Sequence, residues 1–218
     1  MKLFNLNYSV SMSAIALGAA FTASPALADI YEIQLTNVTA NQAFTPRLAV
    51  THTLGQIFTL GDPALDELAL IAESGDIAPL MALLETGGEI VTDIQVGDGL
   101  LMPGDTQTIT IDGTPGTLFS MFNMLIPTND AFLGLNGVML PNSGSVTYRA
   151  TVYDAGSETN DEICSNIPGP VCGGVGSSPD DAGEGFIHVH RGIKGGGDLS
   201  AATYDWNNPA AVVTVTKI

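Results

Sequence analysis

Short runs of alternating apolar and polar residues, separated by turn-forming residues, constrain the fold of this chain more than any other feature. The clearest run is IYEIQLT at 30–36, and such alternation places the apolar side chains on one face of a half-buried β-strand. Further strands are expected at 47–52, 56–60, 89–96, 106–111, 117–125, 131–135, 145–153, 185–190 and 211–216. Turns such as Pro103-Gly104 and Asp112-Gly113 punctuate them. Many short strands with regular turns predict an all-β fold, either a sandwich or a barrel.

Only the region 62–85 has the spacing of apolar residues that is typical of helices. Asp62 is a suitable N-cap, and Pro63 fits the first helical position. Gly75 can end this helix, and Asp76 can cap a second one over 77–85. We therefore expect two short helices inserted near one end of the β-fold, where their apolar faces pack against it.

The first 28 residues have the three parts of a secretory signal peptide. Lys2 is the positive charge, 11–21 is a short apolar stretch, and Ala26-Leu27-Ala28 is a small-residue cleavage site. An uncleaved membrane anchor is the alternative, but the apolar stretch is short for a span. We expect export to the periplasm or the cell surface, a single mature domain at 29–218, and no transmembrane segment within it.

The acidic composition excludes several classes of partner. The chain has 6 Lys and Arg against 23 Asp and Glu, a formal net charge of −17 that becomes −18 once Lys2 is removed. Such a charge repels phosphate backbones and anionic lipid, so nucleic-acid binding and docking on acidic membranes are not expected. The charge favours cations, although solubility alone is an alternative explanation.

Two cysteines, Cys164 and Cys172, lie eight residues apart in one Pro- and Gly-containing segment. In an exported chain such a pair is expected to form a disulfide. A cysteine-based metal site is disfavoured, because this spacing is not a zinc-ribbon pattern and no second pair exists.

Sequence motifs of common enzymes are absent. There is no Gly-x-Ser-x-Gly elbow, no phosphate-binding loop and no His-Glu-x-x-His. The chain has 3 histidines, and His188 and His190 alternate within one expected strand, so both can face the same side. Together with His52 they form a conceivable three-histidine metal site. A metal-dependent enzyme using these residues is the alternative to a binding protein.

Oxygen-bearing side chains cluster in two segments. Asn129-Asp130 lies in an expected loop, and DAGSETNDE at 154–162 contains four carboxylates within nine residues. Gly156 permits a sharp bend, so that Glu158 can fold back toward Asp154. Calcium takes six to eight oxygen ligands with flexible geometry, which such a loop supplies. The EF-hand spacing is absent, and a solvated loop without an ion is the alternative.

Six segments, in this order, resemble the spondin N-terminal domain in its bacterial form. They are NQAFTP at 41–46, TH at 51–52, AESGD at 72–76, IPTNDAF at 126–132, DAGSETNDE at 154–162 and HVHRGI at 188–193. Each motif is short, but together they extend over nearly all of 29–218, and the Asp-Ala-Gly-x-Glu segment is specific.

This resemblance implies an antiparallel β-sandwich with short helices and a calcium ion at one end. Mapped onto this chain, the ligands are Asp130, Asp154 and Glu158; animal members usually carry aspartate where Glu158 stands. In animals the family belongs to extracellular matrix and adhesion proteins. The expectation is therefore a calcium-binding, non-catalytic surface module with an unknown surface or matrix ligand. The appended repeat domains of the animal proteins are not expected in this chain, so their partner specificity does not carry over.

Overall fold

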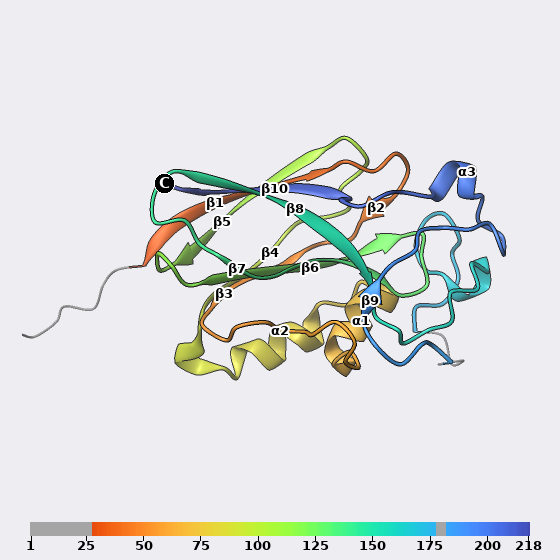
Figure 1. The fold of residues 1–218 in the computed structure, drawn as a ribbon, viewed down its shortest axis with the longest axis horizontal. Coiled ribbons are helices and arrows are strands. Elements are labelled where there is room, and N and C mark those ends of the chain that lie inside the picture. The colour runs from red at the N-terminus through yellow and green to blue at the C-terminus, as the bar shows by residue number, and fades with distance from the viewer. Residues whose placement is uncertain (1–27, 178–181) are drawn as a thin grey trace, which may run out of the picture.

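The protein is described here by a computed structural model that covers residues 28–177 and 182–218 (Figure 1). The predicted signal peptide at 1–28 lies outside these residues, except for Ala28. The strands are β1 (Asp29–Asn37), β2 (Ala43–Phe44), β3 (Leu48–His52), β4 (Val91–Val96), β5 (Thr106–Gly113), β6 (Leu118–Ile126), β7 (Ala131–Met139), β8 (Ser145–Asp154), β9 (His188–Val189) and β10 (Ala211–Lys217). The helices are α1 (Asp66–Ser74), α2 (Ala78–Glu85) and α3 (Ala201–Tyr204), with two 3₁₀ turns at Gly88–Ile90 and Cys164–Asn166. The prediction of an all-β fold is confirmed. No helix within the described residues is long and apolar enough to cross a bilayer.

The strands form one nearly closed antiparallel sheet in the order β4-β3-β6-β7-β8-β10-β1-β5, with β2 beside β6 and β9 beside β8. Figure 1 shows two layers, with β1, β5, β8 and β10 in one and β3, β6 and β7 in the other. Strand β8 connects the layers, because its first part pairs with β10 and its last four residues pair with β7. The end strands β4 and β5 are linked by a side chain: the carboxylate of Asp93 accepts the backbone N–H of Asp112 at 2.9 Å.

The main core lies between the two layers. The alternating residues Tyr31, Ile33 and Leu35 of β1 are buried there, as their spacing predicts. Strand β6 does not alternate, because all its residues after Leu118 are buried. The second face of β6 is covered by the helices, and a strand that is covered on both faces is mostly apolar rather than alternating; its polar residues, Ser120 and Asn123, are buried too.

Helices α1 and α2 cover the outer face of the β3, β6 and β7 layer, rather than one end of the fold (Figure 1). Leu68 and Ile71 of α1 pack with Phe122 and Phe132 in a second core. Helix α1 begins later than predicted, at Asp66, and ends at Ser74; Gly75 caps it, as predicted, with a left-handed φ of 71°.

The predicted strand at 56–60 is wrong. This segment crosses the outer face without a ladder, held by the side chain of Asn136, which accepts from the N–H of Ile57 at 2.7 Å and donates to the carbonyl of Phe58 at 2.7 Å. The predicted strand at 185–190 is only the two-residue β9, which adds to the end of β8. This end of the sheet carries the long loop that follows β8.

Candidate metal site

The sheet brings two distant acidic segments together at one end. Asp154 is the last residue of β8 and pairs with Ala131, the first residue of β7, so that Asp130 lies at the same end of the sheet. The loop after Asp154 returns Glu158 to this position. Asp130, Asp154 and Glu158 are 0%, 1% and 2% exposed. Burial of three carboxylates in one loop region is costly unless each is compensated.

The Asp130 carboxylate is held by the loop that follows β8. Its Oδ2 accepts the backbone N–H groups of Ser157 at 2.8 Å and Glu158 at 3.0 Å. Its Oδ1 is buried and has no hydrogen-bond partner among the described residues. Burial, followed by the negative charge of Asp154, raises the pKa of Asp130 to about 7, although the two N–H groups act to lower it. A carboxylate in this position therefore favours a proton or a cation.

The Asp154 carboxylate is positioned through both of its oxygens. Oδ1 accepts the N–H of Gly156 at 2.9 Å, and Oδ2 accepts the side-chain amide of Asn160 at 2.7 Å. Burial raises the pKa of Asp154, while the Asn160 hydrogen bond opposes the shift. In the described parts of the chain, no Lys or Arg lies within ion-pair distance of Asp130 or Asp154. No Lys or Arg of the described residues therefore neutralises this charge; the basic side chains beside Asp154 are His188, at 3.6 Å, and His190, at 3.8 Å.

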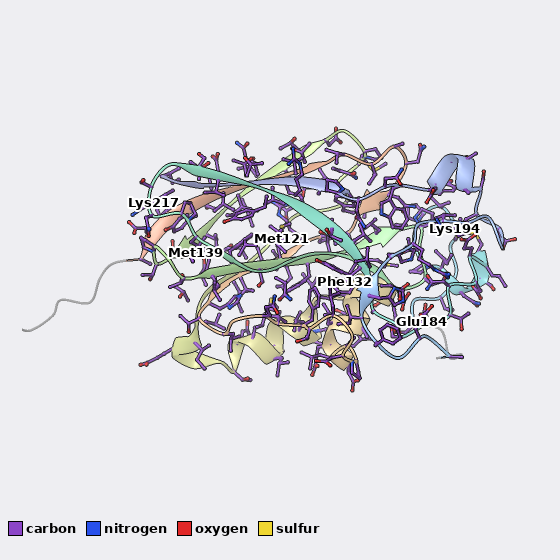
Figure 2. All side chains as sticks on the ribbon, viewed as in Figure 1. Met121, Phe132, Met139, Glu184, Lys194 and Lys217 are labelled. Atoms are coloured by element: carbon purple, nitrogen blue, oxygen red, sulfur yellow. A yellow bond between two sulfur atoms is a disulfide. The ribbon has the colours of Figure 1, made fainter. Side chains whose placement is uncertain are left out.

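Among the residues that the structure describes, one group of three potential ligands is close enough to hold a metal ion. Atoms of Asp154, Glu184 and His188 all lie within 4.8 Å of one another. His188 belongs to β9, which pairs with Asp154, and Glu184 lies beside this strand (Figure 2). Our sequence reasoning did not select Glu184. The four-residue spacing between Glu184 and His188 is the sequence signal that could have identified Glu184. Only the fold shows that Asp154 lies close to both residues.

The fold does not bring the three histidines together, so the alternative of a three-histidine site is wrong. His52 ends β3 and pairs with Leu118, which stands at the opposite end of β7 from Ala131. At about 3.3 Å per residue, the nine-residue strand β7 separates these ends by about 25 Å. Both ring nitrogens of His52 already have partners, Ser120 Oγ at 2.8 Å and the N–H of Leu54 at 3.2 Å. His52 is thus a core histidine, and burial lowers its pKa.

His190 supports the site rather than offering a ligand. Its Nδ1 accepts the N–H of Gly192 at 2.9 Å, so the proton of the neutral ring is on Nε2, which lies 3.1 Å from Asn160 Oδ1. The ring stacks on Trp206 at 5.0 Å. Burial, and then the charges of His188, Arg191 and Lys194, lower its pKa to about 3. His190 therefore stays neutral and orients Asn160, which in turn holds Asp154.

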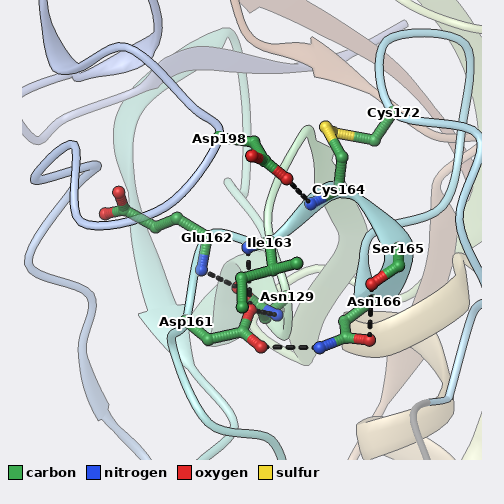
Figure 3. The surroundings of a disulfide bond; sticks show 9 residues. All are labelled: Asn129, Asp161, Glu162, Ile163, Cys164, Ser165, Asn166, Cys172 and Asp198. Carbon is green, nitrogen blue, oxygen red and sulfur yellow. Dashed lines mark hydrogen bonds between the residues drawn. A yellow bond between two sulfur atoms is a disulfide. The ribbon is translucent and has the colours of Figure 1, made fainter.

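The other two acids of the loop, Asp161 and Glu162, hold the loop in place through hydrogen bonds. Asp161 accepts hydrogen bonds from the side chains of Asn129 at 3.0 Å and Asn166 at 2.6 Å (Figure 3). Glu162 accepts from the backbone N–H of Gly196 at 2.7 Å. These contacts attach the loop to the segments before β7 and after β9.

The predicted disulfide between Cys164 and Cys172 is present (Figure 3). The backbone N–H of Cys164 also donates to Asp198 at 2.9 Å. The cross-link therefore ties down the part of the long loop that follows the acidic segment.

Gly156 permits the loop to pass close to its neighbour. Its φ is +67°, and a Cβ at this position would lie 2.4 Å from the carbonyl oxygen of Phe186. The N–H of Gly185 donates to the Gly156 carbonyl at 2.8 Å. This close approach places the segment containing Glu184 against the end of β8, as the ligand group requires.

No family model matches the chain, and a comparison with curated proteins finds no match.

Proposed function

We propose that this chain is an exported, non-catalytic binding module that holds a calcium ion with Asp130, Asp154 and Glu158. The observation that carries the proposal is the Asp130 carboxylate, which is fully buried beside a second buried carboxylate and has one oxygen without a hydrogen-bond partner among the described residues. A cation at that oxygen would remove both the desolvation cost and the repulsion.

Calcium suits the chemistry of this region better than smaller hard ions. It accepts six to eight oxygens in irregular geometry, and the loop offers carboxylates and backbone carbonyls. Magnesium requires a near-octahedral set and keeps most of its water. The resemblance to spondin N-terminal domains supports the same ligands and a role at a surface or matrix.

The export part of the proposal is supported by two features of the chain. A disulfide persists mainly in oxidising compartments outside the cytosol. The N-terminal segment has the charge and apolar pattern of a signal peptide.

A calcium titration of thermal stability tests the proposal. The protein is stripped with EDTA, and its melting temperature is followed as calcium is added to millimolar concentration, because extracellular sites have Kd values of about 10⁻⁴ to 10⁻³ M. At a hundredfold excess over Kd, an ion that binds only the folded state stabilises it by about 2.7 kcal/mol. We expect this gain in the wild type and a much smaller gain in Asp154→Asn, which keeps the shape but loses the charge.

Asp105→Asn is the matched control, because Asp105 is an exposed aspartate in the turn before β5. Its gain should equal that of the wild type. An unchanged wild-type melting temperature across the titration would refute the calcium site.

A further inference from the structure

We propose that Asp154, Glu184 and His188 form a second metal site, which prefers a borderline transition-metal ion such as Zn²⁺ over calcium. The three residues lie at the same end of the sheet as Asp130 but offer a mixed nitrogen and oxygen set. The site shares Asp154 with the proposed calcium site. It rests on separate observations and does not require calcium to bind.

The Nε2 atom of the His188 ring faces the carboxylates of Asp154 and Glu184. His188 Nδ1 lies 3.2 Å from the carbonyl oxygen of Val189, which can only accept, so Nδ1 carries the proton of the neutral ring. In the neutral tautomer with its proton on Nδ1, Nε2 has a free lone pair, the arrangement found where a backbone carbonyl fixes the tautomer of a metal-binding histidine. A second proton on the ring, or a metal ion between Nε2 and the carboxylate oxygens, makes this arrangement favourable.

The distances fit ligands around an ion better than direct hydrogen bonds. His188 Nε2 is 3.6 Å from Asp154 Oδ1 and 3.7 Å from Glu184 Oε2. Both distances exceed the usual N–H···O range. Ligands bound at about 2.0–2.2 Å in a tetrahedral set stand about 3.3–3.6 Å apart, so little movement would complete the coordination.

Contacts behind the ligands hold two of them in place. The amide of Asn160 donates to Asp154, and His190 holds Asn160, so the carboxylate is oriented through a buried chain of hydrogen bonds. Ile187, next to His188, donates its N–H to the carbonyl of Asp62 at 2.8 Å, which fixes this segment against the loop before α1. Such outer partners are typical of metal sites.

The ligand set determines the preferred ion. Imidazole nitrogen favours Zn²⁺, Cu²⁺ or Ni²⁺, whereas calcium selects oxygen ligands. Two carboxylates and a neutral imidazole balance the charge of a divalent cation. The side chains of Glu184 and His188 are 33% and 22% exposed, so solvent can deliver the ion and fill the remaining position.

Zinc titration of the calcium-free protein tests the proposal. The full chain, prepared without a histidine tag, is stripped of metal and titrated with ZnCl₂ by calorimetry in the absence of calcium, because the two proposed sites share Asp154. We expect one zinc per chain. Replacing one outer partner of a metal site typically weakens binding by about 10- to 100-fold. Loss of a ligand in Glu184→Gln or His188→Gln should therefore weaken zinc binding by about tenfold or more.

Two further readouts separate ligand loss from damage to the fold. Co²⁺ in place of zinc should give intense visible absorption in the wild type and lose it in His188→Gln. Glu85→Gln, at an exposed position at the end of α2, is the control and should bind zinc as the wild type does. The calcium-induced rise in melting temperature should be unchanged in Glu184→Gln, because Glu184 is not a proposed calcium ligand.

Absence of stoichiometric zinc binding, or equal zinc affinity in His188→Gln and the wild type, would overturn the proposal. The two proposals fail separately. Zinc binding that depends on His188, without any calcium effect, would refute only the calcium site. A calcium effect without zinc binding would refute only the second site.

Discussion

Replacing Asp130 by asparagine should make the calcium-free protein relatively more stable at high pH. The substituted side chain would keep a carbonyl oxygen for the N–H groups of Ser157 and Glu158, which Asp130 Oδ2 now accepts. The substitution would remove the charge that is buried beside Asp154. The perturbation therefore isolates the electrostatic cost of this carboxylate.

The magnitude follows from the pKa of Asp130, which burial and Asp154 raise from 3.8 to about 7. Because the folded state binds a proton more tightly than the unfolded state, the wild type gains stability below pH 7. This contribution is fully present below pH 3.8 and is lost as the pH rises through 7. One pKa unit corresponds to about 1.4 kcal/mol, so about 3 kcal/mol should be lost between pH 5 and pH 8.

The assay is urea unfolding of both proteins in EDTA at pH 5, 6, 7 and 8. The difference in free energy of unfolding, variant minus wild type, should rise by about 3 kcal/mol across this range. Titrating groups remote from Asp130 are common to both proteins and cancel, whereas Asp154, which interacts with Asp130, titrates differently in the variant. Asp105→Asn, in which a solvated charge is removed, should show a difference that stays nearly constant.

A constant difference for Asp130→Asn as well would refute the reasoning. It would mean that the Asp130 carboxylate keeps its charge at no cost when the protein folds. The raised pKa, and with it the argument that this position favours a cation, would then be wrong.

Three further outcomes are expected. Changing Cys164 and Cys172 to serine should lower the free energy of unfolding by about 2–3 kcal/mol, measured by urea denaturation, because the closed loop no longer restricts the unfolded chain; equal stability would contradict this. Gly156→Ala should lose about 1–3 kcal/mol to backbone strain, plus the cost of the clash with the adjacent loop, and should weaken zinc binding. Gly185→Ala, which has a positive φ but nothing within 4 Å of its Cβ, should show the strain alone, and equal losses in the two variants would disprove the clash. The exported protein should begin at or near Asp29 by intact mass, and a product that retains 1–28 would contradict the signal peptide.

The secondary structure was largely predictable because it depends on local patterns. Alternation in β1 and the Gly75 stop signal of α1 act within a few residues, and both appear where expected. The segment at 56–60 was predicted wrongly, because its backbone groups are bound by Asn136, which lies far away in the sequence. No local pattern reveals such a partner.

For the candidate site, too, some features could be predicted from the sequence and others depend on the tertiary fold. By itself the sequence determined which segments carry clustered oxygen-bearing side chains, and that Cys164 and Cys172 are near enough to bond. It left open which histidine belongs with the acids. Only the antiparallel register decided this, because β9 pairs His188 with Asp154, while β3 places His52 at the far end of the sheet. Burial was likewise a property of the fold. The same carboxylate is solvated in an open loop, but beneath the loop after β8 it loses water and its pKa rises, since desolvation depends on what the rest of the chain packs around it.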